Sequence, residues 1–231
     1  MKILFIGNSH TYMNDMPKLV QEMIETVKDD VCEVVMMAYS ARSLKWHVNE
    51  EYFSVRFNIL YGKYDFCVIQ EQAHPMAEEH DTAVYANQII EWCKKAKTIP
   101  IIFEPWAEKN SPEIQNEMNR RYRSLAHKEN VLLAPIGEVW SAVYKEIKNQ
   151  FDVDLYYKDG SHASYVGDYL VAMVLTKVIT NKLPAIDSLK AYDFTIPESD
   201  FIPVNENPED EVKFVSSEIS EVIRKNIMLV C

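Results

Sequence analysis

The chain has 231 residues, of which 48% are hydrophobic, and its formal net charge is −11. This length allows one large domain or two small ones, and the acidic balance disfavours nucleic acid and anionic membrane surfaces, because both require clustered positive charge. The chain has only five glycines and contains neither G-x-G-x-x-G nor G-x-x-x-x-G-K-[ST]. Nucleotide binding through phosphate-cradling loops of these kinds is therefore excluded.

Short apolar segments alternate with helical segments along the chain. The apolar runs predict strands over residues 2–6, 31–37, 66–69, 98–103 and 131–134. The helical patterns predict helices over residues 16–28, 82–95, 112–128, 136–149 and 165–180. Strands that alternate with helices indicate right-handed crossovers and a parallel sheet covered by helices on both sides. We therefore expect an α/β fold.

The C-terminal part of the chain differs in composition. Residues 184–210 are rich in Pro, Asp, Glu and Ser, which predicts a surface excursion, and a last amphipathic helix is predicted over residues 209–227. We expect a domain over residues 1–183, with residues 184–231 forming the excursion and a helix that packs on the same domain. No apolar run approaches the roughly 18 residues of a membrane span. Met1 leads directly into the first predicted strand without a leader segment, so we expect a cytoplasmic location.

The cysteines and histidines have no spacing typical of a metal or redox site. The four cysteines are scattered, without a C-x-x-C pair. No two histidines lie at i, i+4 with a carboxylate partner. We therefore expect no metal and no cofactor.

Two polar segments lie where an open α/β sheet forms its site, beyond the carboxyl ends of the strands. The segment G-N-S-H-T (residues 7–11) follows the first predicted strand, and D-G-S-H (residues 159–162) precedes the last core helix. A serine nucleophile needs a base to take its proton, and the base needs an acceptor that holds its tautomer, which Ser9, His162 and Asp159 can supply. Each segment also has a simpler interpretation, in which Ser9 or Asp159 only caps a helix.

The two segments, in this order, resemble blocks of the SGNH (GDSL-type) hydrolase superfamily. F-I-G-N-S (residues 5–9) resembles its G-D-S block, with Asn8 in place of Asp. D-G-S-H-A-S (residues 159–164), with Gly167 and Tyr169 beyond, resembles D-G-x-H-P-S-x-x-G-x-Y, with Ala163 in place of Pro. In detail the chain is similar to the branch with G-N-S-x-T and Q-E-Q blocks. The resemblance covers residues 2–180 and implies a three-layer α/β/α sandwich with a central, flavodoxin-like parallel sheet of about five strands.

The resemblance also assigns roles to residues of the site. It implies that Ser9 is the nucleophile, His162 the general base and Asp159 the residue that orients the base, in agreement with the chemistry that the residues themselves suggest. It further implies an oxyanion hole, to which the backbone N–H of Ser9 would contribute.

The remaining oxyanion donors fall in blocks that depart from the family pattern. Ala41 takes the place of a glycine whose backbone N–H faces the oxyanion, and this donor survives the exchange if φ stays negative. Gln70 takes the place of an asparagine side chain, with Gln72 and His74 as competitors. A purely structural role for Gln70, in which its amide satisfies loop backbone, stays open.

Three further residues are candidates for a substrate pocket, namely His10, Trp46 and Trp106, although surface or core packing explains each of them as well. The resemblance implies a serine esterase that acts on a small-molecule ester with a short acyl group such as acetyl, on a substrate such as an acylated sugar. An O-acyltransferase with the same triad is the nearest alternative, and a catalytically silent carbohydrate-binding module is another. The sequence does not predict an oligomeric state.

Overall fold

The computed structural model describes residues 1–28, 31–184, 190–192 and 212–231. Its centre is a five-stranded sheet with the order β2-β1-β3-β4-β5, in which all neighbouring strands are parallel. The strands are β1 (Lys2–Gly7), β2 (Glu33–Ala38), β3 (Phe66–Gln70), β4 (Ile99–Phe103) and β5 (Leu132–Ala134). Because the strands are parallel, their carboxyl ends meet at one edge of the sheet.

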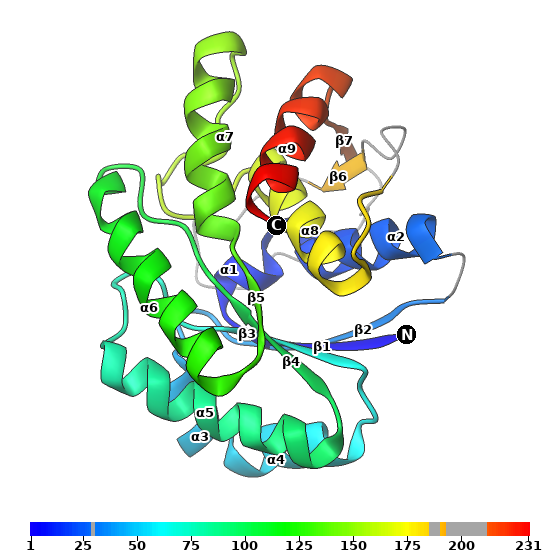
Figure 1. Ribbon diagram of the computed structural model, residues 1–231, viewed down its shortest axis with the longest axis vertical. Coiled ribbons are helices and arrows are strands. Elements are labelled where there is room, and N and C mark those ends of the chain that lie inside the picture. The colour runs from blue at the N-terminus through cyan, green and yellow to red at the C-terminus, as the bar shows by residue number, and fades with distance from the viewer. Residues whose placement is uncertain (29–30, 185–189, 193–211) are drawn as a thin grey trace.

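Helices cover both faces of the sheet, as Figure 1 shows. One layer contains α2 (Met16–Lys28), α7 (Ile136–Gln150), α8 (Tyr165–Thr180) and α9 (Ser217–Val230). The other contains α3 (Leu44–Asn49), α4 (Tyr52–Tyr61), α5 (Glu79–Ala96) and α6 (Gln115–Glu129). Short helices follow β1 and precede α6, namely α1 (Ser9–Tyr12), the 3-10 helix η1 (Met13–Asp15) and the 3-10 helix η2 (Pro112–Ile114). This arrangement confirms the expected three-layer α/β/α sandwich.

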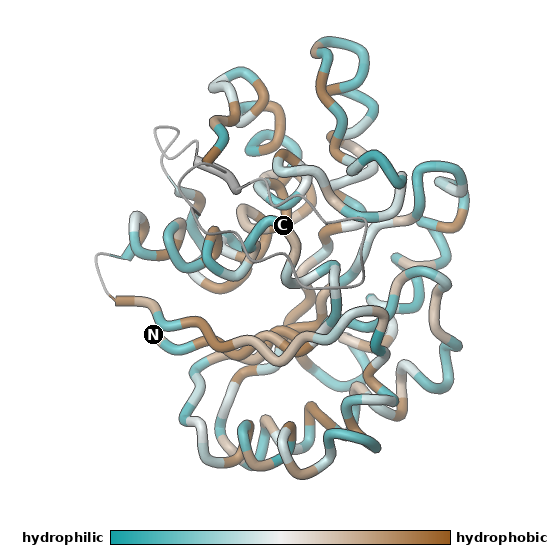
Figure 2. The backbone as a smooth tube through the Cα atoms, turned by 180° about the vertical axis from the view of Figure 1, so that it is seen from behind, coloured by the Kyte–Doolittle hydropathy of each residue, from teal (hydrophilic) through white to brown (hydrophobic). Residues whose placement is uncertain are grey.

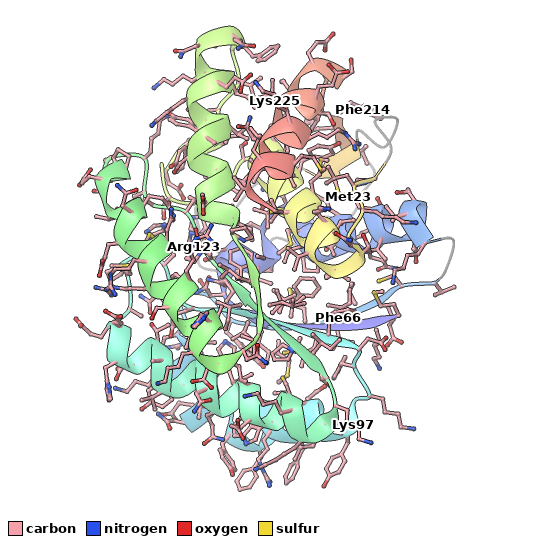
Figure 3. The ribbon with its side chains drawn as sticks, viewed as in Figure 1. Met23, Phe66, Lys97, Arg123, Phe214 and Lys225 are labelled. Atoms are coloured by element: carbon pink, nitrogen blue, oxygen red, sulfur yellow. The ribbon has the colours of Figure 1, made fainter. Side chains whose placement is uncertain are left out.

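The apolar strands explain why both faces must be covered. The strand β1 lies between β2 and β3. From Ile3 onward its side chains are buried on both faces of the sheet. A strand of this kind is typical of parallel sheets, in which helices exclude water from both sides. Figure 2 shows the hydrophobic strands between more hydrophilic helices. Met23 and Phe66, labelled in Figure 3, contribute to the core on the α2 and α8 side.

The helix α8 is the most completely buried helix of this layer. It begins after Ser164, whose hydroxyl accepts a hydrogen bond from the N–H of Gly167 at 3.2 Å. It ends at Asn181, which adopts a left-handed conformation with φ 58°. Serine at the N-terminal cap and asparagine at the C-terminal cap are common choices for a helix. The observed helix agrees with the predicted range of residues 165–180.

The C-terminal region differs from its prediction. The last helix begins at Ser217 and not near residue 209, because Ser216 caps it through a hydrogen bond from the N–H of Ile219. Upstream, β7 (Val212–Phe214) pairs antiparallel with β6 (Lys190–Tyr192). The rest of the predicted excursion, 185–189 and 193–211, lies outside the described residues. In α9, Ile219, Ile223 and Ile227 join the core formed with α7 and α8.

Three helices were not predicted: α1, α3 and α4. The first two are short, with four and six residues, and depend on caps at Asn8 and Ser43. The third, α4, carries apolar side chains on both its inner and its outer side, so it has no clear amphipathic period. Among the described helices, none is long and apolar enough to cross a membrane.

Candidate active site

The nucleophile candidate lies on the turn between β1 and α1. Asn8 caps α1, and its side-chain oxygen accepts a hydrogen bond from the N–H of His10 at 3.1 Å. Its side-chain nitrogen donates to the carbonyl of Arg42 at 3.1 Å, in the loop after β2. Ser9 is thus the first residue of a capped helix, and Asn8 connects this turn to the neighbouring loop.

Close packing beneath the turn explains the glycine that precedes it. A Cβ atom on Gly7 would lie 2.3 Å from Oγ1 of Thr11 and 2.4 Å from Oε1 of Gln70, so these two hydrogen-bonded side chains would have to shift. The carbonyl of Gly7 accepts hydrogen bonds from Nε2 of His47 at 2.8 Å and from the N–H of Tyr39 at 3.1 Å. His47 therefore has a structural role at the turn, and its buried ring acts as a donor.

The second half of the site is the loop between α7 and α8 that contains residues 159–164. Asp159 accepts hydrogen bonds at Oδ1 from the N–H groups of Ser161 and His162, at 2.9 and 3.0 Å. Gly160 has φ 73°, a left-handed conformation that glycine adopts without strain. The N–H of Tyr157 donates to the carbonyl of His162 at 2.8 Å. These bonds hold the Asp159 carboxylate and the His162 ring on one compact turn.

The structure brings Ser9, His162 and Asp159 together. Nε2 of His162 lies 2.8 Å from Oγ of Ser9, and Nδ1 lies 2.7 Å from Oδ2 of Asp159. Both distances are within hydrogen-bond reach, and each ring nitrogen has one partner. A neutral imidazole with its proton on Nδ1, donated to Asp159, leaves Nε2 free to take the proton of the Ser9 hydroxyl.

The electrostatics of Asp159 suit this role. Burial alone raises the pKa of its carboxyl, but hydrogen bonds from the His162 ring and from the N–H groups of Ser161 and His162 outweigh burial and lower the pKa. The carboxylate therefore stays ionised beside the ring. A negative charge at this place stabilises an imidazolium when His162 accepts a proton.

Two backbone N–H groups, one in the turn of Ser9 and one in the neighbouring loop after β2, are unpaired. In the described part of the chain, neither the N–H of Ser9 nor that of Ala41 has a hydrogen-bond partner. The N–H of Arg42 donates to the carbonyl of Tyr39, so Ala41 lies in a tight turn. Its φ is 56°, so the condition of a negative φ is not met. The backbone keeps a glycine-like conformation although the residue is alanine.

The Gln70 side chain reaches the turn of residues 7–9 and makes three hydrogen bonds there. Its oxygen accepts hydrogen bonds from the N–H of Asn8 at 2.9 Å and from the hydroxyl of Thr11 at 3.0 Å. Its nitrogen donates to the carbonyl of Glu71. The amide is buried beneath the turn, and one of its two N–H groups is used by the carbonyl of Glu71. These contacts give Gln70 a structural role at the turn, and Thr11, whose part was not foreseen, shares them.

The two competitors for the oxyanion role lie in the loop after β3. Nε2 of Gln72 lies 3.5 Å from the carbonyl of His74, a long contact. Burial, followed by the proximity of His162, lowers the pKa of His74 to about 4. His74 is therefore neutral near pH 7, and its Nε2 is buried without a hydrogen-bond partner among the described residues.

His10 lies directly behind the His162 ring. Its ring centroid is 4.8 Å from that of His162, 5.1 Å from that of His74 and 5.1 Å from that of Trp106. Burial, together with the neighbouring imidazoles, lowers the pKa of His10 well below its usual range. A neutral, buried His10 packs against the His162 ring without adding charge and supports that ring.

The other two pocket candidates differ from each other. Trp106 is completely buried, stacks on Trp140 with a centroid distance of 4.3 Å, and donates to the carbonyl of Ser161 at 2.9 Å. It supports the His162 loop from within the core and does not form a pocket wall. Trp46 instead borders an open hollow of about 320 Å³ that is also lined by Ala41 and Arg42. Ser9, Asp159 and His162 do not line this hollow.

One buried pair at the site was not foreseen. Nδ2 of Asn14 donates to the carbonyl of Ala163 at 3.1 Å and to Oδ2 of Asp168 at 2.7 Å. Burial raises the pKa of Asp168 well above its usual range, and the hydrogen bond from Asn14 offsets this only in part. The signal in the sequence is an aspartate on a helix that is otherwise apolar. The pair joins the segment after the nucleophile to the residue after His162.

Comparisons with known proteins identify the fold. No protein-family model matches the chain, and no curated protein matches it either. Solved structures match across about three quarters of it. The acetyl xylan esterase AlAXEase is 17% identical, with a TM-score of 0.60, and the match covers 76% of this chain and 98% of that one.

Two further structures are similar to the same extent. A catalytic mutant of Axe2, an acetylxylan esterase from Geobacillus stearothermophilus, is 14% identical with a TM-score of 0.57, over 78% of this chain and 92% of that one. A structure from Desulfitobacterium hafniense DCB-2, named as a lipolytic protein of the G-D-S-L family, is 18% identical with a TM-score of 0.58, over 77% of this chain and 98% of that one. The chain therefore has the fold of the SGNH (GDSL-type) hydrolases.

Proposed function

We propose that the protein is a serine esterase that uses Ser9, His162 and Asp159 as its catalytic triad. The observation that carries this proposal is the continuous hydrogen-bonded chain of these side chains, with distances of 2.8 and 2.7 Å. Three residues from two distant segments meet with the donor and acceptor geometry that nucleophilic catalysis requires. The same geometry favours an enzyme over a silent carbohydrate-binding module, which has no need of an aligned nucleophile and base.

The reaction follows from the atoms that are present. Oγ of Ser9 attacks the ester carbonyl while Nε2 of His162 takes its proton, and the ionised Asp159 stabilises the resulting imidazolium. The imidazolium then gives this proton to the leaving alcohol, and the ester C–O bond breaks to leave an acyl-enzyme. Water attacks the acyl group with His162 again as base, which releases the carboxylic acid and restores Ser9.

The negative charge on the carbonyl oxygen needs donors that are already in place. We assign this role to the backbone N–H groups of Ser9 and Ala41, which have no partner among the described residues. Gln70 then acts as a positioning residue, because it holds the N–H of Asn8 and the hydroxyl of Thr11 beneath the turn. His10 supports the His162 ring from behind.

The substrate that we propose is an ester with a short acyl group, such as an acetylated sugar. Two of the similar structures are acetyl xylan esterases by name, which supports this choice at the level of shared fold. The open hollow beside Ala41 is lined by Arg42, Trp46 and Asn49 together with the charged Lys45 and Glu50, and we propose that the sugar part of the substrate contacts it.

The proposal is tested by the hydrolysis of p-nitrophenyl acetate and of acetylated xylo-oligosaccharides. We expect Ser9→Ala to lower kcat by about 10⁴-fold without a change in the circular dichroism spectrum. Ser54, an exposed serine on α4, is the matched control, and Ser54→Ala should keep full activity. Activity of Ser9→Ala within tenfold of the wild type would remove Ser9 from the mechanism.

A further inference from the structure

Glu71 is a buried acidic residue that the proposed reaction does not use. It lies directly after β3 and is only 2% exposed. Burying a carboxyl group is costly unless hydrogen bonds compensate for the loss of water. Oε1 of Glu71 accepts two such bonds, from the N–H of Leu44 at 2.9 Å and from the N–H of Gln72 at 2.7 Å. The first of them connects the loop after β3 with the loop after β2, across 27 residues of sequence.

The contact with Leu44 fixes the start of α3. Leu44 is the first residue of this helix, and the first N–H groups of a helix need acceptors from outside it. Oγ of Ser43 accepts from the N–H of Trp46 at 3.4 Å, and Glu71 accepts from the N–H of Leu44. Leu44 is 1% exposed, so water has little access to its N–H. The helix therefore begins where a side chain from a different strand end holds it.

The loop between β2 and α3 is held from two sides. The turn after β1 holds it through the hydrogen bond from Nδ2 of Asn8 to the carbonyl of Arg42, at 3.1 Å. Glu71 holds it from the β3 side through Leu44. Ala41, whose N–H we assign to the oxyanion, lies next to the first anchor and three residues before the second. Donors to an oxyanion must have their direction fixed before the charge develops, and these two anchors can provide this.

Neighbouring residues after β3 thus hold the two halves of the oxyanion hole. Gln70 accepts hydrogen bonds from the N–H of Asn8 and the hydroxyl of Thr11, in the turn that carries Ser9. Glu71 accepts from the N–H of Leu44, at the end of the loop that carries Ala41. One strand end therefore sets both backbone donors relative to each other.

We propose that Glu71 is a positioning residue of the esterase, which keeps the N–H of Ala41 aimed at the oxyanion through its hydrogen bond to Leu44. The inference rests on the proposed function, in which Ser9 attacks an ester. Glu71 exchanges no proton in the reaction and acts only through the loop. A purely structural Glu71 would affect stability alone, whereas a positioning residue also affects kcat, because a misplacement of about 1 Å can lower a rate about 100-fold.

Steady-state hydrolysis of p-nitrophenyl acetate tests this difference. We expect Glu71→Ala to lower kcat by about 10- to 100-fold, with KM changed by less than about threefold. Glu71→Gln keeps an acceptor oxygen for Leu44 and should stay within about threefold of the wild type. The matched control is Val55→Ala, because Val55 is completely buried in the same core layer. It should lower stability and retain kcat.

Phenylboronic acid provides a readout that depends on the oxyanion hole itself. Its tetrahedral adduct with a serine hydroxyl places an oxygen where the oxyanion of the reaction forms, so it resembles the transition state. Its inhibition constant should rise in Glu71→Ala by about the factor by which kcat falls, and should not change in Val55→Ala. A lower kcat with an unchanged inhibition constant would overturn the proposal.

Amide exchange followed by NMR tests the anchor without any need for catalysis. The N–H of Leu44 should exchange at least about tenfold faster in Glu71→Ala than in Glu71→Gln, and equal rates would overturn the proposal. If Glu71→Ala does not fold, Glu71→Asp tests the same contact, since its shorter side chain withdraws the oxygen from Leu44. A wild-type protein that hydrolyses no ester contradicts the proposed function, whereas an active enzyme in which Glu71→Ala keeps its kcat contradicts only the role of Glu71.

Discussion

The side chain of Asn8, in the turn before Ser9, makes two hydrogen bonds, so a substitution of this one residue tests the geometry of the site. Asn8 accepts a hydrogen bond from the N–H of His10 and donates one to the carbonyl of Arg42. An aspartate keeps the first contact but, when ionised, has no proton for the second. The amide is therefore the side chain that can both cap α1 and tie it to the loop of Ala41.

We expect Asn8→Asp to destabilise the fold by about 1–3 kcal/mol, because a buried carboxylate then faces the carbonyl of Arg42. The same change should lower kcat more than it raises KM, since the loop that carries the N–H of Ala41 loses its anchor. Urea unfolding and steady-state kinetics measure the two effects. Because a protonated carboxyl regains a donor, the loss of stability should shrink toward pH 4. A variant with wild-type stability and kcat at pH 7 would show that the Arg42 contact is unimportant.

The left-handed backbone of Ala41 leads to a second substitution. With φ 56°, alanine carries a conformational cost of about 1 kcal/mol that glycine avoids. A glycine at position 41 removes this cost in the folded state, but it also increases the conformational entropy of the unfolded chain, which offsets part of the stabilisation. We therefore expect Ala41→Gly to be neutral or to raise the free energy of unfolding by less than about 1 kcal/mol, with kcat retained.

The matched control for this prediction is Ala38, which lies in β2 with extended backbone. Ala38→Gly should cost about 0.5–1 kcal/mol, as glycine does within a strand. Equal costs at both positions would contradict a left-handed Ala41. Urea denaturation of the two variants, measured side by side, is sufficient for the comparison.

Whole elements are joined at the site by the Asn14–Asp168 pair, which connects η1 with the start of α8. Asn14 holds the carbonyl of Ala163, the residue that follows His162. We expect Asn14→Gly, which suits the left-handed φ of 51° at this position, to lower kcat while KM changes little. The reason is that the His162 loop loses its connection to the segment that carries Ser9.

The substitution Asp168→Asn distinguishes the effect of the Asn14–Asp168 hydrogen bond from the effect of packing around it. Burial keeps the pKa of Asp168 well above its usual range, so a neutral asparagine resembles the side chain that is present. Asp168→Asn should therefore retain most of the activity, because its amide oxygen still accepts the hydrogen bond of Asn14. If Asp168→Asn is as damaging as Asn14→Gly, the pair acts through packing or charge and not through this bond.

The sequence predicts elements best where caps and apolar patterns agree. The helices α2 and α8 have their predicted bounds, and α8 has Ser164 and Asn181 at its ends. The helix α4 was missed because its outer rings remove the amphipathic pattern. The last helix was predicted too long because the cap at Ser216 and the strand β7 depend on pairing with β6.

Side-chain roles at the site were predictable only in part. The residue types and the order of the Ser9 and His162 segments were enough to predict that these side chains meet, and the fold brings them together. The positions of Trp106 and Gln70 depend on tertiary contacts, namely the stack on Trp140 and the hydrogen bonds beneath Asn8. A residue beyond a strand end can face either the site or the core, and spacing alone does not distinguish these.

For the whole molecule, the buried carboxyl of Glu104 makes stability depend on pH. It lies at the end of β4, where burial, followed by the proximity of Glu138, raises its pKa from the usual 4.5 to about 8. The folded protein therefore keeps a proton that the unfolded chain releases above pH 4.5. Stability from this group is fully present below that pH and is lost as the pH rises toward 8.

We expect Glu104→Gln, which is neutral at every pH, to remove this dependence. The free energy of unfolding of the variant relative to the wild type should increase from pH 5 to pH 8, by an amount of a few kcal/mol. Urea unfolding at several pH values measures it, and the exposed Glu113 provides the control Glu113→Gln. Parallel curves for the Glu104→Gln variant and the wild type would contradict a protonated Glu104.

The covalent labelling of one serine tests the central claim most directly. A fluorophosphonate probe reacts with a serine that an adjacent base activates, and peptide mass spectrometry locates the adduct. The triad predicts a single adduct at Ser9, absent in Ser9→Ala and strongly slowed in His162→Ala. Esterase activity together with an adduct at another serine, or with no adduct at Ser9, would contradict the account.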